Sequence, residues 1–364
     1  MKILRDYLLR EHVSPFFVTL GGMTAVLLIG NILRFAELVI AKGVNPLDLI
    51  RLLLYLVPYL LIFTIPVACL LALVLALGRL NTDFELIAVR ASGVSPARFV
   101  TPLLVVGLLM SGLVLVINDH VVPQAHLAFR RQLKAIGVKQ PTAYLEAGTF
   151  IKEFPPYVIF VYNIQGQKLQ EVRIYEPQPN GPTRTIIADW GEFERLPGKQ
   201  GVALKLHSGT VDEWDVQNPG SFYKVAFTVY TMNLRAGPSD DPERVGRKLK
   251  EMGFRDLTGE SNRLAAEGIE TLPVALELHR RIAASFAPLL FIVAGLIVGL
   301  RQHHHDRLAT FMWVLAIFVT YYLGTIGMNA LALKGWPPAW LAMWMPNLLS
   351  FLVGGILLMR AIRS

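Results

Sequence analysis

Few side chains in this sequence have types and spacing that could carry out chemistry. The densest group of metal-ligand residues is His303-His304-His305, which Asp306 and two arginines flank. Three consecutive residues do not share a helix face and do not converge easily on one ion, so a solvated loop explains them better than a metal site. Signatures of serine hydrolases, zinc proteases and phosphate-binding loops are missing from the sequence. We therefore expect no metal or cofactor on this chain.

Other titratable residues in the middle of the chain are scattered rather than grouped. An enzyme needs a nucleophile, acids and bases that converge on one place. The lone cysteine, Cys69, lies within an apolar run, where it reads as a small buried residue rather than a nucleophile. The remaining candidates for an envelope enzyme are Asp189, His207, Asp212, Glu213 and Asp215.

A more informative charged group lies just before an apolar run near the C-terminus. It is Glu277-Leu278-His279-Arg280-Arg281. Arginine fits carboxylates and phosphates equally well because its guanidinium donates in a planar fork. The cluster of Glu277, His279, Arg280 and Arg281 is thus either a structural group of ion pairs or a contact for a phosphate.

Residues 82–92 have the pattern of a short amphipathic helix. Thr82-Asp83-Phe84-Glu85 has the form of a capping box, and Gly93 is a plausible end signal. Phe84, Ile87, Ala88 and Ala91 recur at helical spacing and so share one face, and the charges are few. The helix either lies on a lipid surface or docks a cytoplasmic partner. Its candidate contact residues are Thr82, Asp83, Phe84, Glu85, Ile87, Ala88 and Arg90.

The elements that must position these groups are mostly membrane spans. The chain is 53% hydrophobic and 17% charged, with a mean hydropathy of +0.46, far from the average of soluble proteins. A bilayer core of about 30 Å needs about 20 apolar residues in a helix. Six runs meet that length: 13–33, 52–78, 99–118, 282–300, 308–333 and 335–359.

The distribution of Lys and Arg predicts how these spans are oriented. With the N-terminus inside, the cytoplasmic segments hold ten basic residues and the opposite short loops hold four. Both termini are then cytoplasmic and the middle domain is periplasmic. The net charge of +8 is spread over loops without a dense basic block, so we expect contacts with anionic membrane lipid and no nucleic acid. Arg280 and Arg281 run against the bias.

Between the third and fourth spans the pattern changes to strands. Short runs rich in β-branched and aromatic residues alternate with turn signals between 149 and 234, which is typical of an antiparallel sandwich or jelly roll. The runs are 157–163, 169–175, 184–190, 202–207 and 222–231. We predict an α-helical polytopic membrane protein with an inserted all-β, jelly-roll-like domain. The predicted parts are spans one to three (1–118), the β-domain (119–240), a periplasmic helical connector (241–281) and spans four to six (282–364).

At the predicted outer end of the first span, Arg34 and Lys42 follow the uncharged run. Anchoring at lipid headgroups would explain them. A cationic rim that holds an anionic amphiphile is the second interpretation.

Over nearly its full length the chain resembles the lipopolysaccharide-export permeases of the LptF/LptG (YjgP/YjgQ) family. The resemblance rests on the three-plus-three spans around a β-domain, on the stretch from Asp83 to Ser95 with its Arg-Ala-Ser-Gly, and on Glu277 to Arg281. The last motif is more similar to the F paralogue than to the G paralogue.

This resemblance implies a permease subunit of an ATP-driven exporter in the inner membrane of a Gram-negative bacterium. Its implied partners are a paralogous permease, a cytoplasmic ATPase dimer that binds the ATP, a single-span periplasmic bridge protein and lipopolysaccharide. Residues 82–92 would couple to the ATPase, and Arg34 and Lys42 would contact lipid A phosphates. The alternative is a membrane-anchored envelope enzyme or a mechanotransmitting permease-like protein that moves no lipid.

Overall fold

The computed structural model of the protein divides into two compact units. It describes residues 2–40, 44–92, 96–139, 147–151, 154, 156–165, 168–178, 181–195, 202–214, 222–234, 247–301 and 307–363. The first unit contains Met1–Asn31, Leu53–Leu127 and Arg247–Ser364. The second contains Ile32–Leu52 and Ala128–Gly246.

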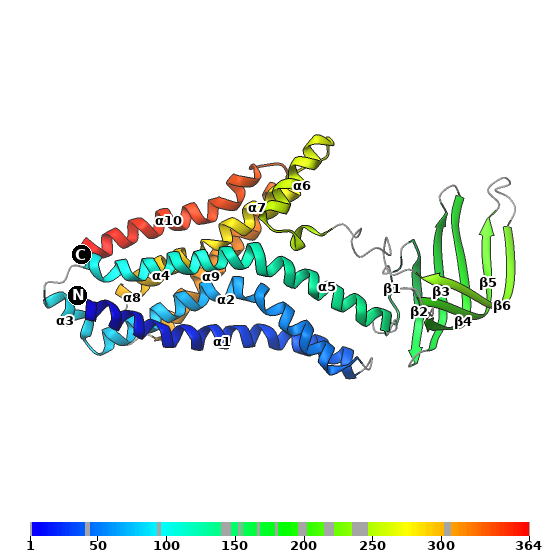
Figure 1. Ribbon diagram of the computed structural model, residues 1–364, viewed down its shortest axis with the longest axis horizontal. Helices are drawn as coiled ribbons and strands as arrows, with labels where there is room; N and C mark the ends of the chain where they lie inside the picture. The colour runs from blue at the N-terminus through cyan, green and yellow to red at the C-terminus, as the bar shows by residue number, and fades with distance from the viewer. Residues whose placement is uncertain are drawn as a thin grey trace. The chain divides into compact units, whose positions relative to one another are not determined.

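Long helices make up most of the first unit, and both chain termini lie at the same end of it (Figure 1). The N-terminal helices are α1 (Lys2–Ile40), α2 (Pro46–Thr82), α3 (Glu85–Ala91), α4 (Pro96–Val116), the π-helical turn η1 (Ile117–Val121) and α5 (Val122–Lys139). The end of α1, the start of α2 and most of α5 belong to the second unit. The C-terminal part of the first unit holds η3 (Leu249–Glu251), α6 (Phe254–Ala266), α7 (Leu272–Ser285), α8 (Ala287–Arg301), α9 (Arg307–Ala332) and α10 (Ala339–Arg363).

Among the described residues, five helices are long and apolar enough to cross a membrane. They are α1, α2, the α4–α5 helix, α9 and α10. A sixth span is formed if α7 and α8, which are bent by 41° at a short break, cross together. The predicted polytopic helical class with an inserted β-sheet is thus confirmed.

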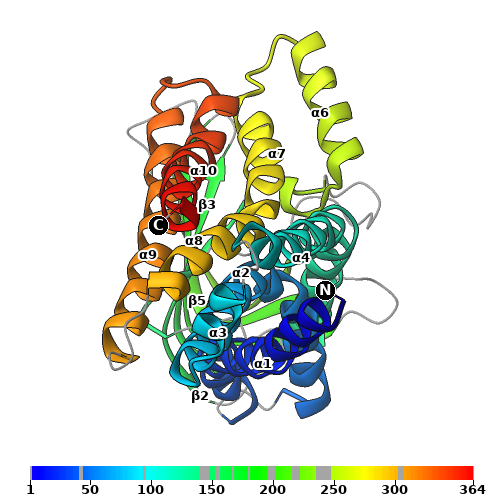
Figure 2. The same ribbon diagram turned by 90° about the vertical axis from the view of Figure 1, so that its left-hand side faces the viewer.

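Helix α2 is the central helix of the first unit, with α1 on one side of it and α7 to α10 on the other (Figure 2). Most of its apolar stretch is buried, whereas α1 and α9 are exposed along most of their length. Gly295 and Gly299 of α8 allow a close approach to α2, since an added Cβ at Gly299 would lie 2.6 Å from the Leu77 side chain. Helix α8 therefore packs closely against α2 through its glycines.

The third span continues well beyond the end that the sequence predicted. We placed the start of the β-domain at residue 119, but the chain stays helical through η1 and α5 to Lys139. A π-helical turn lets the helix absorb one extra residue without ending, and the charged residues that follow 118 do not break a helix. Hydropathy marks the apolar part of a helix and not its length.

The second unit contains a six-stranded antiparallel sheet, and its neighbouring strands are consecutive in the chain. Five of the strands overlap the runs that the sequence pattern predicted. The strands are β1 (Phe150–Ile151), β2 (Val158–Gln165), β3 (Lys168–Gln178), β4 (Gly181–Arg195), β5 (Val202–Trp214) and β6 (Phe222–Leu234).

Alternation along the strands separates a buried face from a more exposed one. Ile159 and Val161 of β2 are fully buried, as are Ile174 of β3 and Leu206 of β5. Tyr162 follows Val161, so its side chain is on the opposite face of β2, and it is 65% exposed. One face of the sheet therefore holds the core of this unit, while its other face keeps exposed aromatic side chains.

We predict that Gly209→Ala loosens the inserted sheet. An added Cβ at Gly209 would collide with the carbonyl oxygen of Ile187 and lie 2.5 Å from the Phe227 ring, so strands must move apart. Such overpacking costs about 1–3 kcal/mol. Protease resistance of the sheet in the detergent-solubilised full chain should fall. Gly259→Ala, where the added Cβ meets open space, is the control; equal resistance of the two variants would contradict the prediction.

Candidate functional site

The short helix α3 begins later than the sequence predicted, because the expected capping box does not form. Thr82 is the last residue of α2, and its hydroxyl donates to the carbonyl oxygen of Gly78 at 2.9 Å. The chain then turns at Phe84, which has φ 58°, and α3 starts at Glu85. A threonine that bonds back to its own helix cannot also cap the next one. The predicted start at 82 is therefore wrong.

One face of α3 is packed against the spans. Leu86 is buried in the same apolar cluster as Leu8 of α1 and Leu80 of α2, and Val89 packs against that cluster. This contact holds α3 against those ends of α1 and α2 that are predicted to lie in the cytoplasm.

Polar contacts tie the same face of α3 to the start of α1. The Tyr7 hydroxyl donates to the Glu85 carboxylate, with 2.8 and 3.0 Å to its two oxygens. Next to it, Arg79 of α2 pairs with Glu11 of α1 at 2.6 Å and with Asp83 at 3.6 Å. Tyr7, Glu11, Arg79, Asp83 and Glu85 form what we call the α1–α3 clamp. The sequence analysis missed Tyr7, Glu11 and Arg79, because the partners are about 70 residues apart.

The opposite face of α3 is apolar and exposed. Phe84 is 60% exposed and Ile87 50% exposed, and Ala88 and Ala91 are also exposed. These are the positions for which helical spacing predicted one apolar face. The side chain of Arg90 lies outside the described residues. The clamp fixes one side of α3 and leaves this apolar face available to a partner or to lipid.

At the other end of the first unit, the residues of the 277–281 cluster are held by protein contacts. Arg281 is only 4% exposed and donates to Glu277 at 2.8 Å and to the carbonyl oxygens of Leu249 and Met252, both at 2.7 Å. Arg280 binds the same carboxylate through two nitrogens at 2.7–3.1 Å. Of the two interpretations for this cluster, the structure supports the ion-pair group for Arg281. His279, partly buried on α7, makes none of these contacts.

Two polar residues from the end of the third span complete this junction. Asn118, which is buried in η1, donates to Ser285 at 3.0 Å. The Asp119 carboxylate accepts from the backbone N–H of Phe254 at 2.6 Å, and so satisfies a free N–H group at the start of α6. Sequence reasoning missed both roles. The sequence did contain a signal for these roles, since two polar residues directly follow an apolar run.

The proposed phosphate contacts at the end of α1 remain predictions. Arg34 lies on α1, but its side chain is outside the described residues, as is Lys42 altogether. The neighbouring Phe35 is buried and its ring centroid lies 6.2 Å from that of Phe129 on α5. His303, His304 and His305 also lie outside the described residues.

Acidic residues of the sheet serve structural contacts with basic and aromatic neighbours. Arg184 pairs with Glu213 at 2.8 Å and with Glu176 at 3.4 Å, and the hydrogen bond to Glu213 raises the pKa of the Arg184 guanidinium. His207 stacks on Trp190 with 3.8 Å between ring centroids. Among the described residues, no group of three metal-ligand side chains converges. Asp215 lies outside them.

Comparison with known proteins agrees with this architecture. Residues 6–360 match the family described as lipopolysaccharide export system permease LptF/LptG. The chain belongs to the LptF/LptG family. It is therefore a lipopolysaccharide export permease, a multi-pass inner-membrane protein that works in a membrane complex with partner proteins. The match covers both paralogues of the LptF/LptG family, so the preference for F stays a prediction.

A relative in the curated proteins is an uncharacterized protein of Rickettsia prowazekii (strain Madrid E). It is 22% identical over 328 residues, which cover 88% of this chain and 89% of the relative. The similarity extends over both the helical and the strand-rich parts of this sequence.

We predict that Arg281→Met destabilises the junction. The change takes the Arg281 donors away from the carbonyl oxygens of Leu249 and Met252 and removes one partner of a buried ion pair, which costs roughly 3 kcal/mol or more. Thermal unfolding in detergent, followed by tryptophan fluorescence, should shift to lower temperature. Arg280→Met is the matched control, because its partly exposed guanidinium holds only Glu277. An equal shift for both variants would argue against the role of the two carbonyl contacts.

Proposed function

We propose that this permease is one half of an ATP-driven exporter that extracts lipopolysaccharide from the outer leaflet of the inner membrane. In this proposal it pairs with a paralogous permease, a cytoplasmic ATPase dimer drives both, and the inserted sheet passes the lipid to a periplasmic bridge protein. The orientation follows the charge bias of the short loops, with both termini cytoplasmic and the sheet periplasmic.

The single observation that supports the ATPase contact is that α3 has one face bonded to the spans and an opposite face that is apolar and exposed. An interfacial helix needs an apolar face toward lipid, but it does not need its polar residues to be bonded to the spans. Here the buried face and the α1–α3 clamp fix α3 at the ends of α1 and α2, and Phe84 and Ile87 stay exposed. A rigidly held apolar helix face at the cytoplasmic end is suited to docking into a groove of a partner.

The same contacts suggest how motion of the ATPase would reach the cargo. Glu85 lies on α3 and Tyr7 on α1, so a shift of α3 acts directly on the first span. Arg34, the proposed contact for lipid A phosphates, lies near the C-terminal end of the same helix α1. Transport then works by differential binding, in which one arrangement of the paired permeases holds the lipid and the ATP-bound arrangement expels it.

Large exposed apolar surfaces support the pairing of two permeases. Along α1, Phe17, Val18 and Leu33 are each more than 60% exposed, and along α9 so are Leu323 and Ile326. Lipid can cover such surfaces, but a cavity for lipopolysaccharide between two permeases needs exposed helix faces on each permease.

Mass spectrometry of the detergent-purified complex tests the proposal. Co-eluting lipopolysaccharide and an ATPase chain support it, and a complex with neither favours a protein that moves no lipid.

We predict that Ile87→Glu abolishes binding of the ATPase without unfolding the membrane part. The side chain is half exposed, so a carboxylate there stays solvated in the free permease but would be buried unpaired in the docked complex. Co-purification of the ATPase should fall by at least tenfold. Ile269→Glu changes a similarly exposed isoleucine between α6 and α7, outside the spans, and is the control for general loss of folding. Intact co-purification with Ile87→Glu would contradict the docking role.

Charge reversal at Glu85 should uncouple transport or assembly. Glu85→Lys places an ammonium where the carboxylate now accepts from Tyr7, and it also changes the charge that α3 presents to a partner. Tyr7→Phe removes only the hydroxyl and keeps the carboxylate, so it separates the two effects. We expect loss of ATPase-dependent lipid release for Glu85→Lys and retention of ATPase co-purification for Tyr7→Phe. Wild-type transport by Glu85→Lys would refute the assignment.

A further inference from the structure

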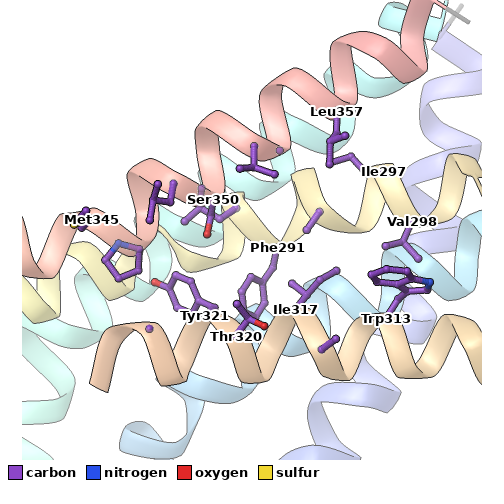
Figure 3. Close-up of a pocket in the computed structure, with 18 of the residues that line it drawn as sticks. Phe291, Ile297, Val298, Trp313, Ile317, Thr320, Tyr321, Met345, Ser350 and Leu357 are labelled. Atoms are coloured by element: carbon purple, nitrogen blue, oxygen red, sulfur yellow. The ribbon is translucent and has the colours of Figure 1, made fainter. Parts of the chain in front are cut away.

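A groove of about 1070 Å³ lies among α8, α9 and α10. Figure 3 shows Phe291, Ile317 and Tyr321 in its middle, Val298, Trp313 and Leu357 near one end, and Met345 near the other. Its volume lies at the top of the range of ligand-binding pockets, about 300–1000 Å³. The groove belongs entirely to the C-terminal spans and involves neither the α1–α3 clamp nor the 277–281 cluster.

Small residues on α9 create this space. Gly324 and Gly327 line the groove, and an added Cβ at either would meet nothing within 4 Å. Ala316 and Ala309 continue the same wall toward the N-terminal end of α9. The groove therefore exists because these positions of α9 have small side chains or none.

The lining has little capacity to hold water. It is almost wholly aliphatic and aromatic, and the Tyr321 hydroxyl is already bonded to Asn347 at 2.9 Å. From Ala309 to Leu331 the wall runs about 33 Å along α9, which is comparable to the thickness of a bilayer core. A dry apolar groove at membrane depth fills with the hydrocarbon chains around it, since any alternative exposes apolar surface to water or leaves a void.

Arginines are concentrated at one end of the groove. Arg360 is exposed and lies three residues beyond Leu357, on the same face of α10 as this lining residue. Arg301 is the last residue of α8 and Arg307 the first of α9, so all three lining helices carry an arginine at this end. At the opposite end, α9 stops at Ala332 and is followed by Lys334.

An exposed tryptophan marks the level of the headgroups at the arginine end. Trp313 lines the groove and is 63% exposed. Tryptophan is enriched where the bilayer core meets the headgroups, because its ring is apolar and its N–H is polar. Arg360 is exposed and lies just beyond this level, so it is placed to pair with phosphate oxygens, and the charge bias assigns this end to the cytoplasm.

We propose that the groove binds an anionic glycerophospholipid of the cytoplasmic leaflet, with acyl chains against α9 and the phosphate at Arg360. This lipid is not the cargo, which the proposed function takes from the opposite leaflet. It fills the space between α9 and α10 and so substitutes for side-chain packing that the glycines and alanines leave out. Arg360 supplies the preference for an anionic headgroup.

The test measures lipid retained by the purified full-length chain. Native mass spectrometry is carried out in detergent with added phosphatidylglycerol, phosphatidylcholine or lipopolysaccharide. We expect phosphatidylglycerol to be retained in preference to phosphatidylcholine. Ala316→Phe fills the groove and should weaken this binding by about tenfold or more, and Arg360→Gln should weaken it by about fivefold.

Matched variants separate the groove from general effects on the helices. Leu315→Phe makes the same aromatic residue one position away, outside the lining, and Lys334→Gln removes a charge at the opposite end. Both should bind phosphatidylglycerol as the wild type does. Equal losses in Ala316→Phe and Leu315→Phe would overturn the site, and so would absence of retained phospholipid.

Two further outcomes bear on the identity of the ligand. Equal binding of phosphatidylcholine, with no effect of Arg360→Gln, would overturn the choice of an anionic headgroup. Displacement of phosphatidylglycerol by lipopolysaccharide would overturn the distinction from the cargo. Because retention is measured without an ATPase or transport, failure of the exporter mechanism and failure of this site give different results.

Discussion

The guanidinium of Arg281 is the group on which the junction of the spans depends. It is almost completely buried, and a buried cation is tolerated only where its donors are paired. Glu277 supplies the opposite charge one helical turn away, and the carbonyl oxygens of Leu249 and Met252 take two further donors. The segment before α6 is therefore fixed to α7. Asp119 then fixes the start of α6 to the end of the third span. Arg281 runs against the charge bias because it is a packing residue and faces no lipid headgroup.

Hydropathy and alternation predicted most of the elements, because both depend on local sequence and on the contrast between apolar surroundings and water. The apolar runs marked the spans, and the period of two in Tyr157 to Asn163 marked a strand. What failed depended on contacts between distant residues or on competing local bonds. Thr82 has two options, to cap the next helix or to bond back to Gly78, and sequence alone does not rank them. The helix beyond residue 118 is stabilised partly by Asn118 and Asp119, whose partners are more than 130 residues away.

The candidate coupling site shows the same division. Spacing predicted that Phe84, Ile87, Ala88 and Ala91 share a face, and they do share an exposed one. The clamp that holds the other face could not be predicted, because Tyr7 and Arg79 look like ordinary interfacial residues in a basic leader and a helix end. Only the fold places Tyr7 within hydrogen-bonding distance of Glu85. Sequence therefore indicates which surface a partner could use, and tertiary contacts determine whether that surface can transmit force.

Helix α9 faces two opposing demands. A permease that opens and closes around a large lipid needs spans that can shift, and interiors packed to crystal density resist such shifts. Along α9, glycine and alanine replace the large side chains that would lock it to α8 and α10. An unfilled gap would forfeit dispersion contacts on every wall. Acyl chains resolve this conflict, since they restore contact with the lining yet change shape when the helices move. The hydrogen bond from Tyr321 to Asn347, together with the Asn347 bond to the Ala283 carbonyl oxygen, joins α9 and α10 to each other and to α7 while the acyl chains adapt.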